Sequence, residues 1–122
     1  MEIPEPIRER RRSLRVEESL PFTIGQRGYE IEARTVNIGY HGAMCELDRD
    51  IPMMTQLSIA LTLPAAGPSG RPRRVSAKGV IVRKERDGIP GGKVRVAIFF
   101  SDIQPKDEAA LREFIDRRLS TD

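Results

Sequence analysis

Residues 55–63 alternate between large aliphatic side chains and small or polar ones, and this alternation limits the fold more than any other feature of the sequence. The aliphatic positions are Leu57, Ile59, Leu61 and Leu63. A repeat of two residues places them on one side of an extended strand and leaves the other side for solvent. The segment therefore predicts a half-buried β-strand within a sheet.

Five further segments have the composition of strands, and turn residues separate them. These expected strands are residues 18–24, 29–36, 43–47, 74–84 and 93–101. Two glycines within residues 25–28 predict a hairpin loop between the first two strands. The stretch 64–72, which is rich in Pro, Gly, Ala and Ser, predicts a surface loop.

The last segment of the sequence changes its apolar period. Leu111, Phe114, Ile115 and Leu119 recur at helical spacing after Pro105, a residue that suits the first position of a helix. We expect an amphipathic helix at about 105–119, whose apolar stripe must pack on the sheet. The 122 residues suit one domain. The pattern predicts a mainly β fold, a small six-stranded antiparallel β-barrel with a C-terminal α-helix packed against it.

Positive charge is concentrated in one short segment. The net charge of the chain is only +3, yet positions 8–15 hold five arginines and one glutamate. Arginine donates paired hydrogen bonds to phosphate and to the edge of guanine, and its charge does not titrate near neutral pH. The cluster favours an anionic ligand, and a solvated arm is the alternative that charge alone leaves open.

The sequence offers little for catalysis or for metal binding. His41 is the only histidine and Cys45 the only cysteine, so they cannot supply a zinc ligand set or an internal disulfide. Cys45 is in phase with Ala43 and Leu47, which predicts a buried core position. Phosphate-loop and dinucleotide fingerprints are absent from the sequence. We therefore expect no enzyme, no metal and no cofactor.

Segment 37–42 (NIGYHG) joins two of the expected strands. Its two glycines permit left-handed torsions or a close approach of a ligand to the backbone. The amide of Asn37 can both donate and accept hydrogen bonds, as the edge of a base requires. A purely structural turn is the alternative interpretation.

Two segments together resemble the signatures of the PilZ domain family. Segment 11–15 (RRSLR) resembles the RxxxR motif of that family, and segment 37–42 resembles its second motif, [DN]xSxxG, at the expected separation. Segments 79–83 (GVIVR) and 94–100 resemble the late strands before the closing helix. The resemblance thus extends over nearly the whole chain.

This resemblance implies a bacterial, cytoplasmic receptor for cyclic di-GMP, a second messenger with two guanines and two phosphates. By analogy with the family, Arg11 and Arg15 would contact phosphates and guanine edges, and Arg12 would add a further contact. Asn37 would bond a guanine edge, and Gly42 would keep the loop tight enough for the ligand to approach.

Gly39 occupies the position where the PilZ motif has serine. One neutral hydrogen bond contributes about 1 kcal/mol, whereas each charge-assisted arginine contact contributes roughly 1.5–3 kcal/mol. Glycine also leaves more backbone entropy to lose when the loop is ordered around a ligand. We expect the missing hydroxyl at position 39 to weaken nucleotide binding without abolishing it.

The resemblance also implies a domain organisation. It predicts a flexible arginine-rich segment at 1–16, which belongs to the ligand site, and a single β-barrel domain at 17–120. Such a receptor would transmit the messenger level to a downstream protein partner, and a homodimer is compatible with this function. No apolar run approaches the roughly 18 residues of a membrane span, so membrane insertion is not expected.

Two other classes of function stay open at this point. A PilZ-like adaptor that binds proteins and no nucleotide is the main alternative, since Gly39 departs from the motif and Met53 and Met54 would form an adaptable contact if exposed. Single-stranded nucleic acid is disfavoured as a partner, because the chain has only six aromatic residues and most of them are in phase with the core.

Overall fold

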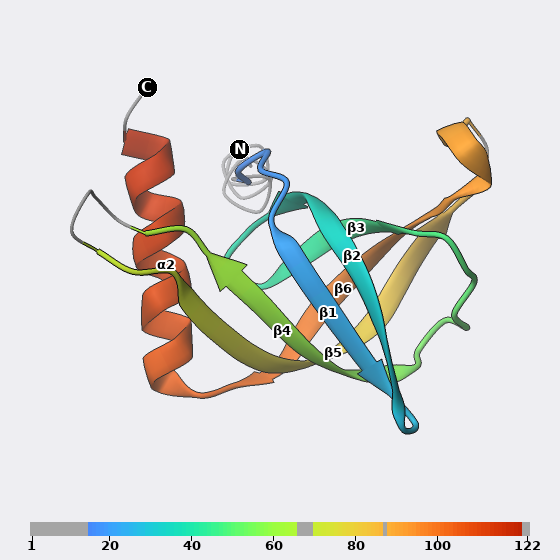
Figure 1. The fold of residues 1–122 in the computed structure, drawn as a ribbon, viewed down its shortest axis with the longest axis horizontal. Helices are drawn as coiled ribbons and strands as arrows, with labels where there is room; N and C mark the ends of the chain where they lie inside the picture. Colours follow the sequence, from blue (N-terminus) through green and yellow to red (C-terminus); the bar gives the residue numbers. More distant parts are fainter. Residues whose placement is uncertain (1–14, 66–69, 87, 121–122) are drawn as a thin grey trace, which may run out of the picture.

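The computed structural model describes residues 15–65, 70–86 and 88–120. Over these ranges the chain forms six strands, a short 3-10 turn and one α-helix (Figure 1). The elements in chain order are β1 (Pro21–Gln26), β2 (Tyr29–Ile38), β3 (Gly42–Leu47), β4 (Gln56–Leu63), β5 (Arg73–Glu85), η1 (Pro90–Gly92), β6 (Val94–Ile103) and α2 (Pro105–Ser120).

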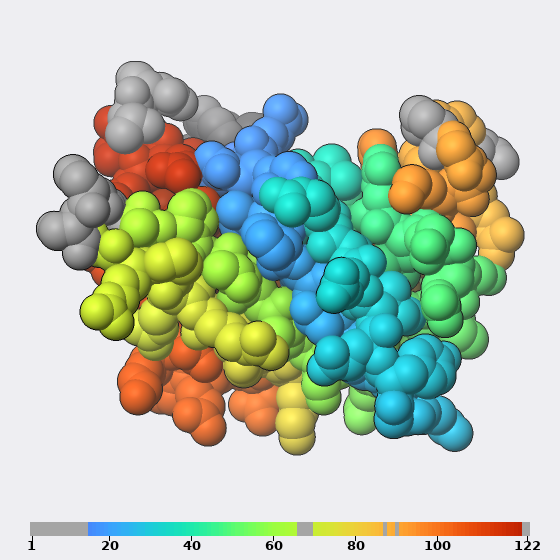
Figure 2. Space-filling model, in the orientation of Figure 1, coloured from blue at the N-terminus to red at the C-terminus, as the bar shows by residue number. Residues whose placement is uncertain are grey.

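The six strands close into an antiparallel barrel with the order β1-β2-β3-β6-β5-β4. Among the strands that the structure describes, closure leaves no unpaired edge to attract another chain. In the space-filling view, β1 and β2 cross the middle of the visible face, while α2 in red and the η1 turn in orange lie at opposite ends (Figure 2). The predicted fold, a six-stranded barrel with one C-terminal helix, is confirmed.

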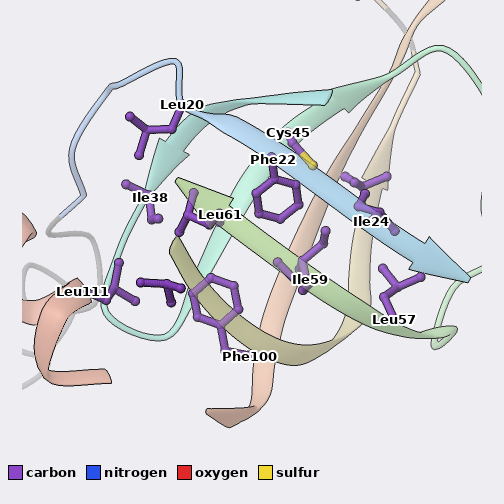
Figure 3. Packing of buried hydrophobic residues seen from close by; sticks show 14 of the residues in the cluster. Leu20, Phe22, Ile24, Ile38, Cys45, Leu57, Ile59, Leu61, Phe100 and Leu111 are labelled. Carbon is purple, nitrogen blue, oxygen red and sulfur yellow. The ribbon is translucent and has the colours of Figure 1, made fainter. Parts of the chain in front are cut away.

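The core fills the barrel with alternate residues of every strand. In Figure 3 the side chains of Phe22 and Ile24 from β1 meet those of Leu57, Ile59 and Leu61 from β4. All of these side chains are buried. The alternation in 55–63 thus has the role that the sequence predicted, because one face of β4 supplies the barrel interior.

Helix α2 lies at the end of the barrel where β4 ends and β5 begins (Figure 1). Its buried residues are Leu111, Phe114 and Ile115, which confirms the predicted apolar stripe. Arg73 at the start of β5 forms an ion pair with Asp107 of the helix at 3.2 Å. No helix within the described ranges is long and apolar enough to cross a lipid bilayer.

The first hairpin is tighter than the sequence predicted. Strand β1 extends to Gln26, so only Arg27 and Gly28 connect it to β2. Both connecting residues have positive φ, 46° and 88°. Two-residue turns with this handedness match the twist of the flanking strands, which explains why the expected four-residue loop is shorter.

The expected first strand, 18–24, begins later in the structure, at Pro21. The preceding residues are attached to Thr35 of β2 without forming a regular ladder: Thr35 N donates to Leu20 O at 3.1 Å, and Thr35 Oγ1 donates to the Glu18 carbonyl and accepts from Leu20 N. The buried Thr35 hydroxyl therefore supplements a single backbone hydrogen bond and satisfies two further backbone groups.

Candidate functional site

A β-bulge near the end of β2 turns Asn37 toward the outer surface of the barrel. The register of β2 against β3 shifts between Thr35 and Asn37, so one extra residue, Val36, lies in β2. With unbroken alternation, Asn37 would follow Thr35 into the core. The bulge shifts the phase by one residue, and Ile38 takes the buried position instead.

Backbone hydrogen bonds attach the segment before β1 to the end of β2. Val16 N donates to Ile38 O at 2.9 Å, and Ile38 N donates to Val16 O at 2.9 Å. This isolated antiparallel bridge holds the buried Val16 side chain in the core. Because the bridge fixes Val16, it places the preceding residue, Arg15, beside Asn37.

The guanidinium group of Arg15 donates hydrogen bonds to two residues of segment 37–42. Its Nε donates to Asn37 Oδ1 at 2.7 Å, and its Nη2 donates to the Gly42 carbonyl at 3.3 Å. Desolvation lowers the pKa of Arg15 below its usual value, but arginine keeps its proton near neutral pH. Both acceptors are neutral oxygens, so neither cancels the positive charge of Arg15.

Segment 37–42 is less of a loop than the sequence suggested. Asn37 and Ile38 belong to β2 and Gly42 opens β3, so the connection is only 39–41. A hydrogen bond from Gly39 N to Gly42 O at 2.9 Å closes it. The φ angles of Gly39 and Gly42 are not positive. The left-handed torsions that glycine would permit are therefore not used here.

Gly42 is required by close packing of β3 against β6. A Cβ atom at this position would lie 2.3 Å from the carbonyl oxygen of Ile98, a distance that real side chains do not tolerate. A hydrogen bond from Phe100 N to the His41 carbonyl at 2.8 Å holds β6 at this spacing. The need for glycine at 42 thus has a structural cause that is independent of any ligand.

Tyr40 attaches the 39–41 connection to helix α2. Its hydroxyl donates to Asp116 Oδ1, and the guanidinium of Arg112 lies 4.6 Å from the centre of its ring. The hydrogen bond to Asp116 is the main cause of the raised pKa of Tyr40. The sequence analysis did not identify this contact, although Arg112 and Asp116 are four residues apart and so share one face of the helix.

A second contact joins α2 to the segment that follows Arg15. Arg118 Nε donates to Glu18 Oε2 at 2.7 Å, and the Arg118 guanidinium also lies 4.7 Å from the ring centre of Phe114. The helix therefore touches both parts of the candidate site, the arginine segment through Glu18 and the 39–41 connection through Tyr40.

The structure describes only some of the other residues that the sequence singled out. Arg11 and Arg12 lie outside the described residues. Cys45 is fully buried, which confirms the core interpretation, and desolvation raises its pKa to about 12. The part of the chain that the structure describes contains no cluster of three or more His, Cys, Asp or Glu residues that could hold a metal ion.

Comparison with known proteins places the whole barrel in one family. A family model of the PilZ domain matches residues 9–117, which include Arg15 and the 39–41 connection. The structure of Bacillus subtilis Inhibitor of motility (MotI/DgrA) is similar with a TM-score of 0.76 and 23% sequence identity, over 88% of this chain and 50% of that one. This chain thus spans half the length of that protein.

Two solved PilZ domains have the same fold at lower similarity. One is the PilZ domain of CeSA from a cellulose-synthesizing bacterium, with a TM-score of 0.55, 11% identity, and coverage of 83% of this chain and 93% of that one. The other is the PilZ domain of Escherichia coli YcgR, solved with c-di-GMP, with a TM-score of 0.55, 17% identity, and coverage of 88% and 89%. No curated protein matches the sequence. From the family match over residues 9–117, we conclude that this chain belongs to the PilZ domain family.

Proposed function

We propose that this domain is a receptor for cyclic di-GMP and that it reports the level of the messenger to a partner protein. The observation that carries the proposal is the 2.7 Å hydrogen bond from Arg15 Nε to Asn37 Oδ1. It brings the last arginine of the RxxxR motif into contact with the first residue of the second motif. Family membership supports the choice of ligand.

The groups at this place suit the chemistry of the messenger. Arg15 carries a charge that its two neutral acceptors leave uncompensated, and its planar fork can bind a phosphate or the Hoogsteen edge of guanine. When the guanidinium turns to the ligand, the amide of Asn37 becomes available to donate and accept at a guanine edge. Arg11 and Arg12 are proposed to add contacts of the same kind.

Gly39 adjusts the strength of this proposed site. Without the hydroxyl of the family motif, the ligand loses one neutral hydrogen bond, which contributes about 1 kcal/mol. The arginine contacts are individually stronger, at roughly 1.5–3 kcal/mol for hydrogen bonds to charged groups. We therefore propose that cyclic di-GMP still binds, with reduced affinity.

Calorimetric titration of the chain with cyclic di-GMP tests the proposal. We expect saturable heat and, in a parallel thermal unfolding experiment, stabilisation that grows with ligand concentration, because the ligand binds the folded state. GMP serves as the control ligand, since it has one base and one phosphate and should bind more weakly. Absence of both heat and stabilisation at high micromolar cyclic di-GMP would refute the receptor function.

A protein-binding adaptor is the second candidate function, and one observation favours it. Met53 and Met54, in the turn between β3 and β4, are 47% and 65% exposed. Flexible methionine side chains at a surface adapt well to a partner. An identified partner should bind the nucleotide-free chain and the Arg15→Ala variant equally well. Loss of that binding in Met54→Ser would support this function. Equal binding to wild type and Met54→Ser would exclude these methionines.

A further inference from the structure

Phe99 is an aromatic side chain on the outer face of the barrel. It lies on β6 between Ile98 and Phe100, which are both buried, so the alternation of the strand directs Phe99 outward. The side chain is 47% exposed. An exposed aromatic ring offers a flat apolar face on which a planar ligand can stack.

The neighbour of Phe99 across the sheet is Gly42. The two residues are direct partners in the β3–β6 ladder. A Cβ atom at Gly42 would lie 3.3 Å from Phe99 Cα, so the backbones of the two residues pass very close together. Because Gly42 has no side chain, the ring of Phe99 borders bare backbone on that side. The carbonyl of Gly42 is also the acceptor of Arg15 Nη2 at 3.3 Å.

The next row of the ladder joins this place to Asn37. Asn37 pairs with Met44, and Met44 pairs with Ala97, which is two residues from Phe99 on the same face of β6. Met44 and Ala97 are half-buried. The outer face therefore carries the amide of Asn37, with the Arg15 guanidinium beside it, and then the half-buried side chains of Met44 and Ala97. The exposed ring of Phe99 lies two residues along β6 from Ala97.

We propose that Phe99 is a stacking platform for a guanine base of the nucleotide that Arg15 and Asn37 bind. This inference rests on the proposed function, because it assigns a base-binding residue to the same site. Strand β3 lies between Asn37 on β2 and Phe99 on β6, so two strand spacings, roughly 10 Å, separate their backbones. A nucleotide easily bridges a span of this size between its phosphate and its base.

The surroundings of Phe99 favour a nucleotide over a protein as the occupant. A base needs a flat apolar surface for its face, together with polar groups for its edge and a cation for its phosphate. Phe99 on β6 and Asn37 on β2 lie on either side of β3, and with Arg15 they provide these three functions on one outer face. Stacking on an aromatic side chain strengthens the binding of a base by on the order of tenfold or more, and it tolerates any base because each has a flat face.

The test uses the absence of tryptophan from this sequence. In Phe99→Trp the introduced indole is the only tryptophan, so its fluorescence reports the environment of position 99 alone. We expect cyclic di-GMP to quench this fluorescence saturably, with the same midpoint as the calorimetric heat. Phe99→Ala should bind about tenfold more weakly than wild type.

Tyr29→Ala is the matched control. Tyr29 is 50% exposed and lies at the start of β2, at the opposite end of the strand from Asn37. Its removal should leave the affinity for cyclic di-GMP unchanged.

Three outcomes would overturn the proposal. Wild-type affinity in Phe99→Ala together with constant fluorescence in Phe99→Trp would overturn the platform and leave the receptor function intact. Absence of cyclic di-GMP binding in the wild type would overturn both. Loss of a protein partner in Phe99→Ala, at unchanged nucleotide affinity, would assign the ring to a protein interface and also refute the platform.

Discussion

Arg15 and Asn37 are 22 residues apart in the sequence, and a 2.7 Å hydrogen bond joins Arg15 Nε to Asn37 Oδ1. The Val16–Ile38 bridge fixes the backbone beside this bond, and the bulge in β2 turns the amide outward to meet it. The two side chains are thus arranged before any ligand arrives. Pre-arranged groups lose less conformational freedom on binding, which offsets the cost of breaking this hydrogen bond when the guanidinium turns to the ligand.

Replacing Arg15 by alanine should weaken the binding of cyclic di-GMP by about 10- to 100-fold. The change removes a charge-assisted contact, and hydrogen bonds to charged groups contribute about 1.5–3 kcal/mol. Calorimetric titration measures the difference. Arg49→Ala is the control, because Arg49 is an exposed arginine that lies over the ring of Tyr29 at the far end of β2. Equal losses in both variants would indicate a general charge effect and would refute the assignment of Arg15.

Replacing Gly39 by serine should strengthen nucleotide binding by about fivefold, which corresponds to roughly 1 kcal/mol for one neutral hydrogen bond. The φ angle of Gly39 is not positive, so a side chain at this position meets no left-handed backbone strain. Gly39→Ala is the matched comparison, since it also stiffens the connection but adds no hydroxyl. If the alanine variant gains as much affinity as the serine variant, backbone entropy is the cause and the hydroxyl is not.

Replacing Gly42 by alanine should destabilise the fold itself. The added Cβ would lie 2.3 Å from the Ile98 carbonyl oxygen, so β3 and β6 must separate locally. Overpacking of this kind destabilises proteins by about 1–3 kcal/mol. Thermal unfolding gives the comparison with Gly25→Ala, where the new Cβ would have ordinary contacts with Ser58 at 3.6 and 3.7 Å. Equal midpoints for the two variants would contradict the close packing described for Gly42.

Tyr40→Phe should reduce the free energy of unfolding by about 1 kcal/mol near neutral pH, because it deletes the hydrogen bond to Asp116. That bond raises the pKa of Tyr40 above its usual value of 10.0. A raised folded-state pKa gives stability that is complete below about pH 10 and is lost as the pH rises through the folded-state value. Denaturant unfolding at several pH values should therefore show the wild type and Tyr40→Phe converging at alkaline pH. A difference that stays constant across this range would contradict the assigned cause.

The thiol of Cys45 should not react with a disulfide reagent in the native protein. It is fully buried, so the reagent cannot reach the sulfur. Desolvation also raises its pKa to about 12, so the reactive thiolate form is scarce near neutral pH. Labelling measured by absorbance should be negligible in buffer and rapid after unfolding in urea. Rapid labelling of the native chain would show that β3 opens readily.

The elements with a strong period were predictable from the sequence. The alternation of 55–63 and the helical spacing of Leu111, Phe114 and Ile115 correspond to β4 and α2 almost residue for residue. Both patterns arise from burial of one face, which the order of side chains records directly. The barrel followed because six such strands and one helix have few other ways to bury their apolar faces.

The details around Asn37 and Tyr40 were not predictable in the same way. A bulge depends on how two strands pair, and the sequence around Val36 does not distinguish a bulged strand from a regular one. The contact of Tyr40 with Asp116 joins residues 76 positions apart, and a single sequence records no such pairing. The need for glycine at 42 likewise comes from the approach of Ile98, which only the folded barrel reveals.

The most direct measurement of the central claim is an NMR titration of the 15N-labelled chain with cyclic di-GMP. The Nε–H signal of Arg15 and the side-chain amide signals of Asn37 report the two groups that this hydrogen bond joins. We predict that both shift saturably with one common dissociation constant, while the backbone amide of Tyr29 at the other end of β2 stays unchanged. Saturable shifts that omit Arg15 and Asn37, or no shifts at high micromolar cyclic di-GMP, would contradict the account.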